Sequence, residues 1–177
     1  MGSENYYIGK GKVSIAPWPN SAVAPTYTEL GNAPKFEYEM TEETKEHFSS
    51  QQGTKEQDAE ITITTGYALA MTLDEISASN LKMFCRGQQV GDKIYANMDT
   101  NRNYAIKFVS DNPTGLNQTI EFHKVKLTPQ GAFSLISDDF TTLNFNGKGL
   151  SDRANFSTSP FFTTTLSTTT TTTTTTA

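Results

Sequence analysis

The side chains of this 177-residue chain that could perform acid–base or nucleophilic chemistry are few and poorly spaced. Neither of its two histidines, His47 and His123, stands at a spacing that predicts a catalytic triad or a set of metal ligands. Ser49 and Ser50 follow His47 without the turn sequence that presents a nucleophilic serine. Residues 9–12, GKGK, lack the spacing of a phosphate-binding loop. We therefore expect no catalytic residue, no metal site and no cofactor.

Two alternating segments, residues 35–40 and 60–71, are the elements that must position the other side chains. In both, apolar residues alternate with charged or polar ones, which is the period of a strand with one buried face. The segment between them, residues 41–58, far exceeds the ~2 to 5 residues that usually close a hairpin. Connections of this length are usually functional or disordered.

Two interpretations of residues 41–58 are open. The segment is either a flexible surface loop or an arm that becomes ordered against a partner. In the second interpretation Phe48, the one large apolar side chain of the segment, is the anchor. The charged residues expected to set the register of that contact are Glu42, Glu43, Lys45, Glu46, Lys55 and Glu56.

A helix is expected directly after the second alternating segment. Thr72-Leu73-Asp74-Glu75 has the spacing of a capping box. Apolar residues then recur near the helical period as far as Phe84, and Gly87 can supply a left-handed exit. The pattern predicts one helix over residues 72–86, packed on a sheet.

The remaining pattern predicts strands separated by Gly, Pro, Asn and Asp clusters. These strands are expected at residues 6–16, 103–110, 118–127, 132–137 and 141–146. Turn residues at 111–115 predict that the strands before and after them form a hairpin. The sequence therefore predicts a mainly β or α+β domain over residues 1–160. We expect a β-sandwich or barrel-like fold with one flanking helix and a long hairpin arm.

Residues 161–177 form a Thr-rich tail that ends in an unbroken Thr run before Ala177. Its low complexity predicts disorder. Threonine is also β-branched and favours extended backbone, so a partner with a free sheet edge could capture the tail as an added strand.

Four segments carry a resemblance to a known family. They are IGKGKVSIA at residues 8–16, LGNAPKFEYEMTEETKEHFSS at 30–50 with Gly53 after it, DNPTG at 111–115 and TLNFNGKGLSD at 142–152. They resemble segments of phage tail tube proteins, the major tail proteins of long-tailed, non-contractile phages. In that family the second segment begins an inner-sheet hairpin whose tip reaches the neighbouring ring.

The resemblance implies a virion structural protein with the tail-tube β-sandwich fold. Six subunits would form a ring, and stacked rings would form a hollow tail tube that conducts DNA without binding it specifically. The implied partners are other copies of the chain, a tape measure protein, and the tail initiator and terminator proteins. Cys85 is the only cysteine, and no signal peptide or membrane-spanning run is present in the sequence. We therefore expect assembly in the host cytoplasm and no membrane segment.

The acidic net charge of the chain is consistent with a tube through which DNA passes. At a formal net charge of −5 per chain, six copies would carry about −30 per ring, and a wall of that sign repels DNA. A basic wall would instead hold the DNA backbone through counterion release. If the solvent face of the two long strands lines the channel, as the resemblance suggests, the lumen-facing candidates are Glu37, Glu39, Glu60, Thr62 and Thr64.

Two alternatives stay open. The tube could belong to a phage-derived bacteriocin or a secretion device, which would differ in cargo rather than in architecture. The chain could instead be a monomeric virion decoration or adhesin module that presents its arm outward to a ligand. Enzymatic activity has the least support, because no motif accompanies the isolated histidines and serines.

Overall fold

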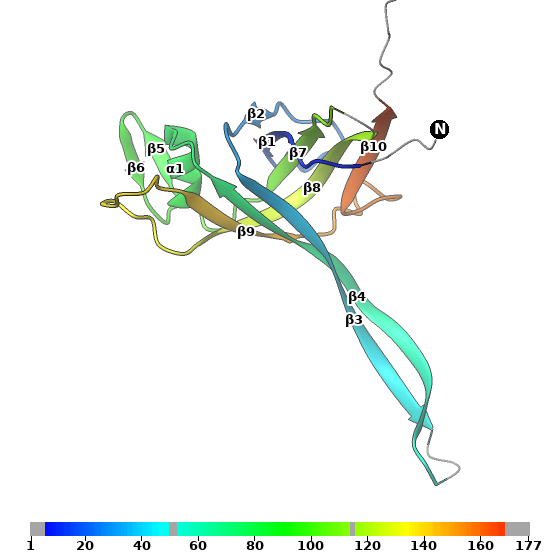
Figure 1. The fold of residues 1–177 in the computed structure, drawn as a ribbon. Helices are drawn as coiled ribbons and strands as arrows, with labels where there is room; N and C mark the ends of the chain where they lie inside the picture. Colours follow the sequence, from blue (N-terminus) through cyan, green and yellow to red (C-terminus); the bar gives the residue numbers. More distant parts are fainter. Residues whose placement is uncertain (1–5, 50–52, 114–115, 169–177) are drawn as a thin grey trace, which may run out of the picture.

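The computed structural model describes residues 6–49, 53–113 and 116–168. This part of the chain is mainly β, with one short helix (Figure 1). The strands are β1 Gly11–Pro17, β2 Thr28–Glu29, β3 Lys35–Ser49, β4 Glu56–Leu73, β5 Gln88–Val90, β6 Lys93–Tyr95, β7 Tyr104–Ser110, β8 Leu116–Gln130, β9 Leu143–Gly149 and β10 Phe162–Thr168, and the helix is α1 Ala78–Phe84. The expectation of a mainly β domain with one helix is confirmed.

A single antiparallel sheet contains all the described strands except the β5–β6 hairpin. Its order is β2-β1-β7-β8-β9-β4-β3, and β10 pairs with β8 outside this path. The long β8 pairs with β10 along its first half and with β9 along its second half. The hairpin predicted around residues 111–115 is confirmed as β7–β8, although residues 114–115 lie outside the described part.

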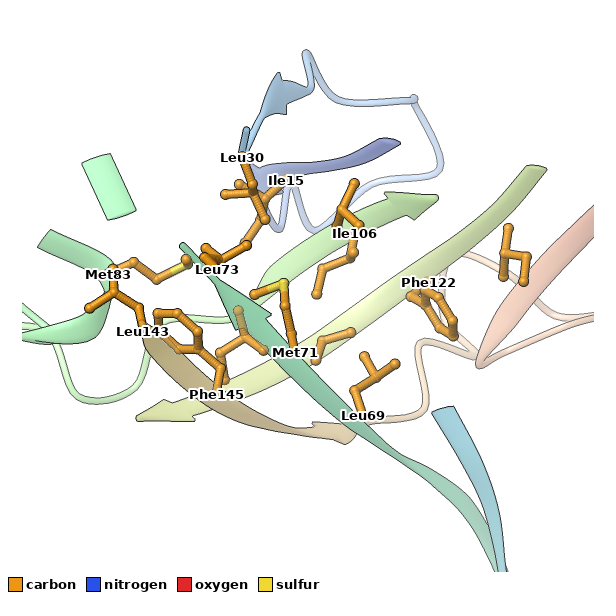
Figure 2. Packing of buried hydrophobic residues seen from close by; sticks show 14 of the residues in the cluster. Ile15, Leu30, Leu69, Met71, Leu73, Met83, Ile106, Phe122, Leu143 and Phe145 are labelled. Atoms are coloured by element: carbon orange, nitrogen blue, oxygen red, sulfur yellow. The ribbon is translucent and has the colours of Figure 1, made fainter. Parts of the chain in front are cut away.

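The sheet curls so that the beginning of β3 faces strands that are not its neighbours. The ring of Phe36 lies 5.7 Å from that of Phe108 on β7, and the ring of Tyr38 lies 5.7 Å from that of Phe122 on β8. The inner face therefore closes over a hydrophobic core to which β1, β4, β7, β8 and β9 all contribute (Figure 2). Each large side chain buried there stabilises the fold by about 1.5–3 kcal/mol.

The helix begins later than the capping-box pattern predicted. β4 continues through Leu73, and Thr72 pairs with Asn144 on β9, donating from Oγ1 to its Oδ1 at 2.7 Å. The N-cap is Ser77, whose Oγ accepts from the backbone N–H of Asn80 at 3.1 Å. The prediction of a helix from residue 72 was wrong because sheet pairing already satisfies the backbone there, which overrides a local capping signal.

The strand predicted at residues 132–137 is also absent. β8 remains paired with β9 as far as Gln130, and Gly131, with φ of 75°, starts a loop over residues 131–142. The Pro-Gln-Gly sequence at 129–131 is thus the end of a longer strand rather than a turn between two short ones. Proline, which has no backbone N–H to donate, is tolerated here because β8 has a neighbour on only one side beyond Val125.

The described part of the Thr-rich tail belongs to the fold. Phe161 and Phe162 pack against the core, and β10 pairs along β8 from the Phe162–Phe122 pair onward. The disorder predicted from composition is therefore wrong for residues 162–168, and the boundary expected after residue 160 divides a continuously packed segment. The strand adds to the edge of its own sheet rather than to that of a partner. Residues 169–177 lie outside the described part.

Candidate assembly surface

The most exposed element is the projecting part of the β3–β4 hairpin, residues 37–49 and 53–65, which we call the arm. Figure 1 shows it as a twisted two-stranded ribbon that leaves the body of the domain. Its backbone pairs within the chain out to Ser49 and Glu56, and Gly53 has φ of 80° in the connection. The flexible-loop interpretation of residues 41–58 is therefore wrong, because the described part of the segment is paired as two strands of one hairpin. Docking of the arm on a partner stays a prediction.

No described side chain of the arm is buried. The strands nevertheless keep large apolar groups along the ribbon. Met40, Ile61 and Ile63 are 57%, 65% and 57% exposed, and the predicted anchor Phe48 is 47% exposed. β-branched and apolar residues favour the extended backbone, but on the arm they have no core to enter.

The arm region also contains the net charge of the chain. Residues 35–60 include eight acidic residues and three lysines, whereas the rest of the chain has eleven of each sign. The formal charge of −5 therefore resides on this one element, and the remainder is balanced. Such segregation produces a field that can orient an approaching partner.

Two of the predicted arm carboxylates are held by threonines of the opposite strand. Thr62 donates from Oγ1 to the carboxylate of Glu42, and Thr64 donates from Oγ1 to Glu43 Oε2 at 3.0 Å. Adjacent residues of a strand point to opposite faces, so these two pairs lie on opposite faces of the ribbon.

A register shift separates the lumen candidates. Glu43 pairs with Thr64 but Thr44 pairs with Thr62, which leaves Ile63 as an extra residue in β4. By this register one face holds Glu37, Glu39 and Thr64, and the other holds Thr62 and Glu60. The prediction that all five share a face was wrong, because simple alternation fails across a bulge.

The remaining predicted contact residues lie on the outer half of the arm, and all are exposed. Glu46 lies opposite Glu60, Lys45 lies opposite Ile61, and Lys55 precedes β4. Like charges directly opposite each other in a sheet are destabilising. A cationic group from a partner at the Glu46–Glu60 pair would offset this repulsion.

The two histidines occupy different environments. His47 is on the arm, with Nδ1 2.6 Å from Asp58 Oδ1. His123 is buried, its ring stacks on Phe156 at 3.7 Å, and its Nε2 lies 3.1 Å from Thr163 Oγ1 on β10. Burial lowers the pKa of His123, against the opposing effect of the carboxylates around it. Among the described residues, no group of three or more His, Cys, Asp and Glu side chains could hold a metal ion.

Two features were missed in the sequence. The indole of Trp18 donates from Nε1 to the buried carboxylate of Asp152 at 2.9 Å, a pairing across most of the chain that no local pattern indicates. The loop at 131–142 exposes large apolar side chains, where the sequence pattern indicated a strand. In both cases the contacts that determine the structure join residues far apart in the sequence.

A family model matches half of the chain. The model of a family described as "protein of unknown function UCP028589" matches residues 6–94, a range that includes the whole arm. No curated protein matches the chain. Within the described residues, no helix has the length and apolar character needed to cross a membrane.

Proposed function

Since the chain belongs to the family described as protein of unknown function UCP028589, we propose its function from the arm: it is a structural subunit that assembles with copies of itself into a hollow tube. The observation that carries this proposal is a long ribbon with no buried side chain. This ribbon, the arm, is the projecting part of β3 and β4, which are 15 and 18 residues long in full.

Such a ribbon is poorly suited to an isolated molecule. A two-stranded hairpin is marginally stable in water unless it packs against something else. β3 is the last strand of its sheet, so one edge of the arm is unpaired throughout, and β4 pairs with β9 only from residue 68 onward. Free edges of this kind are templates for pairing with another chain. Docking on a neighbouring copy would cover both the edges and the exposed apolar groups.

The tubular form of the assembly is supported by the resemblance to phage tail tube proteins. A protruding arm that contacts a different surface of the next copy is a heterologous contact, and such contacts generate rings or filaments. In this proposal six-subunit rings stack through their arms into a phage tail tube through which DNA passes. The subunit has no catalytic step, and tape measure, initiator and terminator proteins set the length and ends of the tube.

Negative-stain electron microscopy across a concentration series tests the proposal. We expect hollow rings at low concentration and hollow filaments at high concentration. Monodisperse monomers at every concentration, with and without an initiator-containing lysate, would contradict it. That result would favour the virion decoration or adhesin function, in which the arm meets a ligand rather than a copy of the chain.

A further inference from the structure

The loop at residues 131–142, which we call the knob, is the most apolar exposed segment of the body. Leu135, Ile136 and Phe140 are 84%, 97% and 97% exposed. Three large apolar side chains so fully in water within six residues are unusual for a surface loop, where apolar residues normally occur singly. The knob therefore has the character of an interaction site.

The knob is held at its base. Thr141 donates from Oγ1 to the carbonyl of Ser134 at 2.9 Å, and the ring of Phe133 lies 5.8 Å from that of Phe84 on α1. The exposed side chains are thus presented from an anchored loop. A preorganised loop loses less conformational entropy when it binds.

A groove of about 700 Å³ lies between β1, β7 and β8 on one side and the beginning of β3 on the other. Its lining includes the apolar side chains of Phe36, Tyr38, Phe108 and Ile120. Gly11 lets β1 pack closely on β7 at this groove, because a Cβ there would lie 2.4 Å from the carbonyl oxygen of Val109 and 2.7 Å from the ring of Phe108. The volume is in the range that accepts several apolar side chains.

Charges at the two surfaces are complementary. The knob contains Asp138 and Asp139 and no basic residue. The groove is bordered by Lys10 and Lys35, the second of which pairs with Glu37 at 3.0 Å. For Lys10, no ion pair is found among the residues that the structure describes. Complementary charge around an apolar centre gives a contact its orientation.

We propose that the knob of one copy inserts into this groove of the next copy. Leu135 and Ile136 then lie against the aromatic rings that line the groove, those of Phe36, Tyr38 and Phe108. Asp138 and Asp139 lie near Lys10. Figure 1 places the knob, in yellow, beside β5 and β6 at one end of the body, whereas β1 lies beside β2 and β7 in its middle. The two surfaces thus belong to different parts of one chain, and the contact is heterologous, as ring closure requires. The inference rests on the proposed function and assigns the contact within a ring, while the arm makes the contact between rings.

Site-specific crosslinking tests the assignment. In a Cys85→Ser background, one preparation carries Ile136→Cys in the knob and a second carries Gln118→Cys in the groove. A short thiol-specific crosslinker should join the two preparations when they are mixed and should join neither with itself. A third preparation with Phe48→Cys, at the arm, is the matched control and should not crosslink to the groove cysteine.

The outcomes separate this inference from the proposed function. Crosslinking of Ile136→Cys with itself, or of Phe48→Cys with the groove cysteine, would overturn the knob assignment. Tubes seen by electron microscopy without any knob–groove crosslink would overturn it while leaving the proposed function intact. Persistent monomers without crosslinks would overturn both.

A second measurement does not depend on crosslinker geometry. The double variant Leu135→Ser and Ile136→Ser should raise the dissociation constant of self-association by about tenfold or more, as loss of a central apolar anchor does. Val23→Ser removes another exposed apolar side chain, 75% in water, outside the knob and should leave that constant unchanged. Equal effects of the two changes in sedimentation experiments would contradict the assignment.

Discussion

Asp152 is the residue whose local role can be tested most directly. Its carboxylate is 3% exposed and accepts from Trp18 Nε1 at 2.9 Å and from Asn155 Nδ2 at 2.8 Å. Asp152→Ala leaves these two half-buried donors without their acceptor, so we expect the free energy of unfolding to fall by about 1–3 kcal/mol. Equilibrium urea unfolding measures this change.

The matched control for that variant is Asp138→Ala, which removes an exposed carboxylate from a loop and should change the free energy of unfolding by less than about 0.5 kcal/mol. Equal losses for the two variants, measured at dilute protein concentration, would mean that the Trp18–Asp152 pair does not fasten the segment after β9 to the body.

The burial of His123 leads us to expect that the free energy of unfolding depends on pH. Burial lowers its pKa in the folded state, and in the unfolded chain the pKa returns to about 6.5. Below about pH 6.5 the unfolded chain therefore binds a proton that the folded chain resists, and the free energy of unfolding falls as the pH falls. Above that pH the imidazole is neutral in both states and contributes no pH dependence.

The variant His123→Gln should remove this part of the acid-side loss. Urea unfolding at about pH 7.5 and about pH 5.5 compares the two proteins on either side of the unfolded pKa. The wild type should lose more stability than the variant between the two pH values. An identical loss in both would show that His123 is not the titrating group.

At the scale of elements, Phe48 should matter for assembly and not for folding. Its side chain lies on the arm, far from the core cluster, so Phe48→Ser should leave the free energy of unfolding within about 0.5 kcal/mol of wild type. Stacking should weaken, and electron microscopy should show shorter tubes or single rings. Phe122→Ser, at a fully buried position, should instead lower the unfolding free energy by about 3–5 kcal/mol. Wild-type tube length in Phe48→Ser would refute the anchor role.

The terminal strand gives a second prediction at this scale. Deleting residues 163–177 removes most of β10 and leaves the first half of β8 without its partner on that side. We expect lower thermal stability and concentration-dependent aggregation, because an unpaired edge invites strand pairing between chains. Deleting only residues 169–177 preserves the described strand and should have neither effect. Thermal unfolding with light scattering distinguishes the two truncations.

Element by element, the sequence was informative where the pattern is local and periodic. The alternation around Tyr38 and the turn chemistry after Ser110 correctly indicated β3 and the β7–β8 hairpin. The sequence was not informative where pairing with a distant strand determines the local structure. Thr72 belongs to β4 because Asn144 pairs with it, and the bulge at Ile63 arises from the fit between two strands. Neither condition can be read from a window of neighbouring residues.

At the scale of the whole molecule, the candidate surface was only partly foreseeable. The unusual length and charge of residues 41–58 marked the arm as important, and the structure extends it as a free ribbon. The knob was missed because its residues 132–137, AFSLIS, are locally consistent with a strand. Only the pairing of β8 with β9 through Gln130 shows that these residues are left outside the sheet.

The distribution of charge predicts how an assembled tube treats DNA. Glu37 and Glu39 lie on the same face of β3, and in the proposed tube this face lines the channel. Wild-type tubes should not bind a short DNA duplex measurably, because the lining repels phosphate. Reversing both charges, Glu37→Lys with Glu39→Lys, changes the formal charge from −5 to −1. It should create binding that weakens steeply as salt rises from about 50 to about 200 mM.

Fluorescence anisotropy of labelled duplex with assembled tubes provides that measurement. The control Asp92→Lys with Asp111→Lys changes the net charge equally but at exposed positions of the body away from β3. If only total charge mattered, both double variants would bind DNA alike, because the field far from the surface depends on net charge. Binding confined to the β3 variant would assign the Glu37 and Glu39 face to the channel. Equal binding would show that net charge alone governs the contact with DNA and would contradict the assignment of this face. Binding only by the control would assign the channel to another face of the sheet and leave the arm as an external contact.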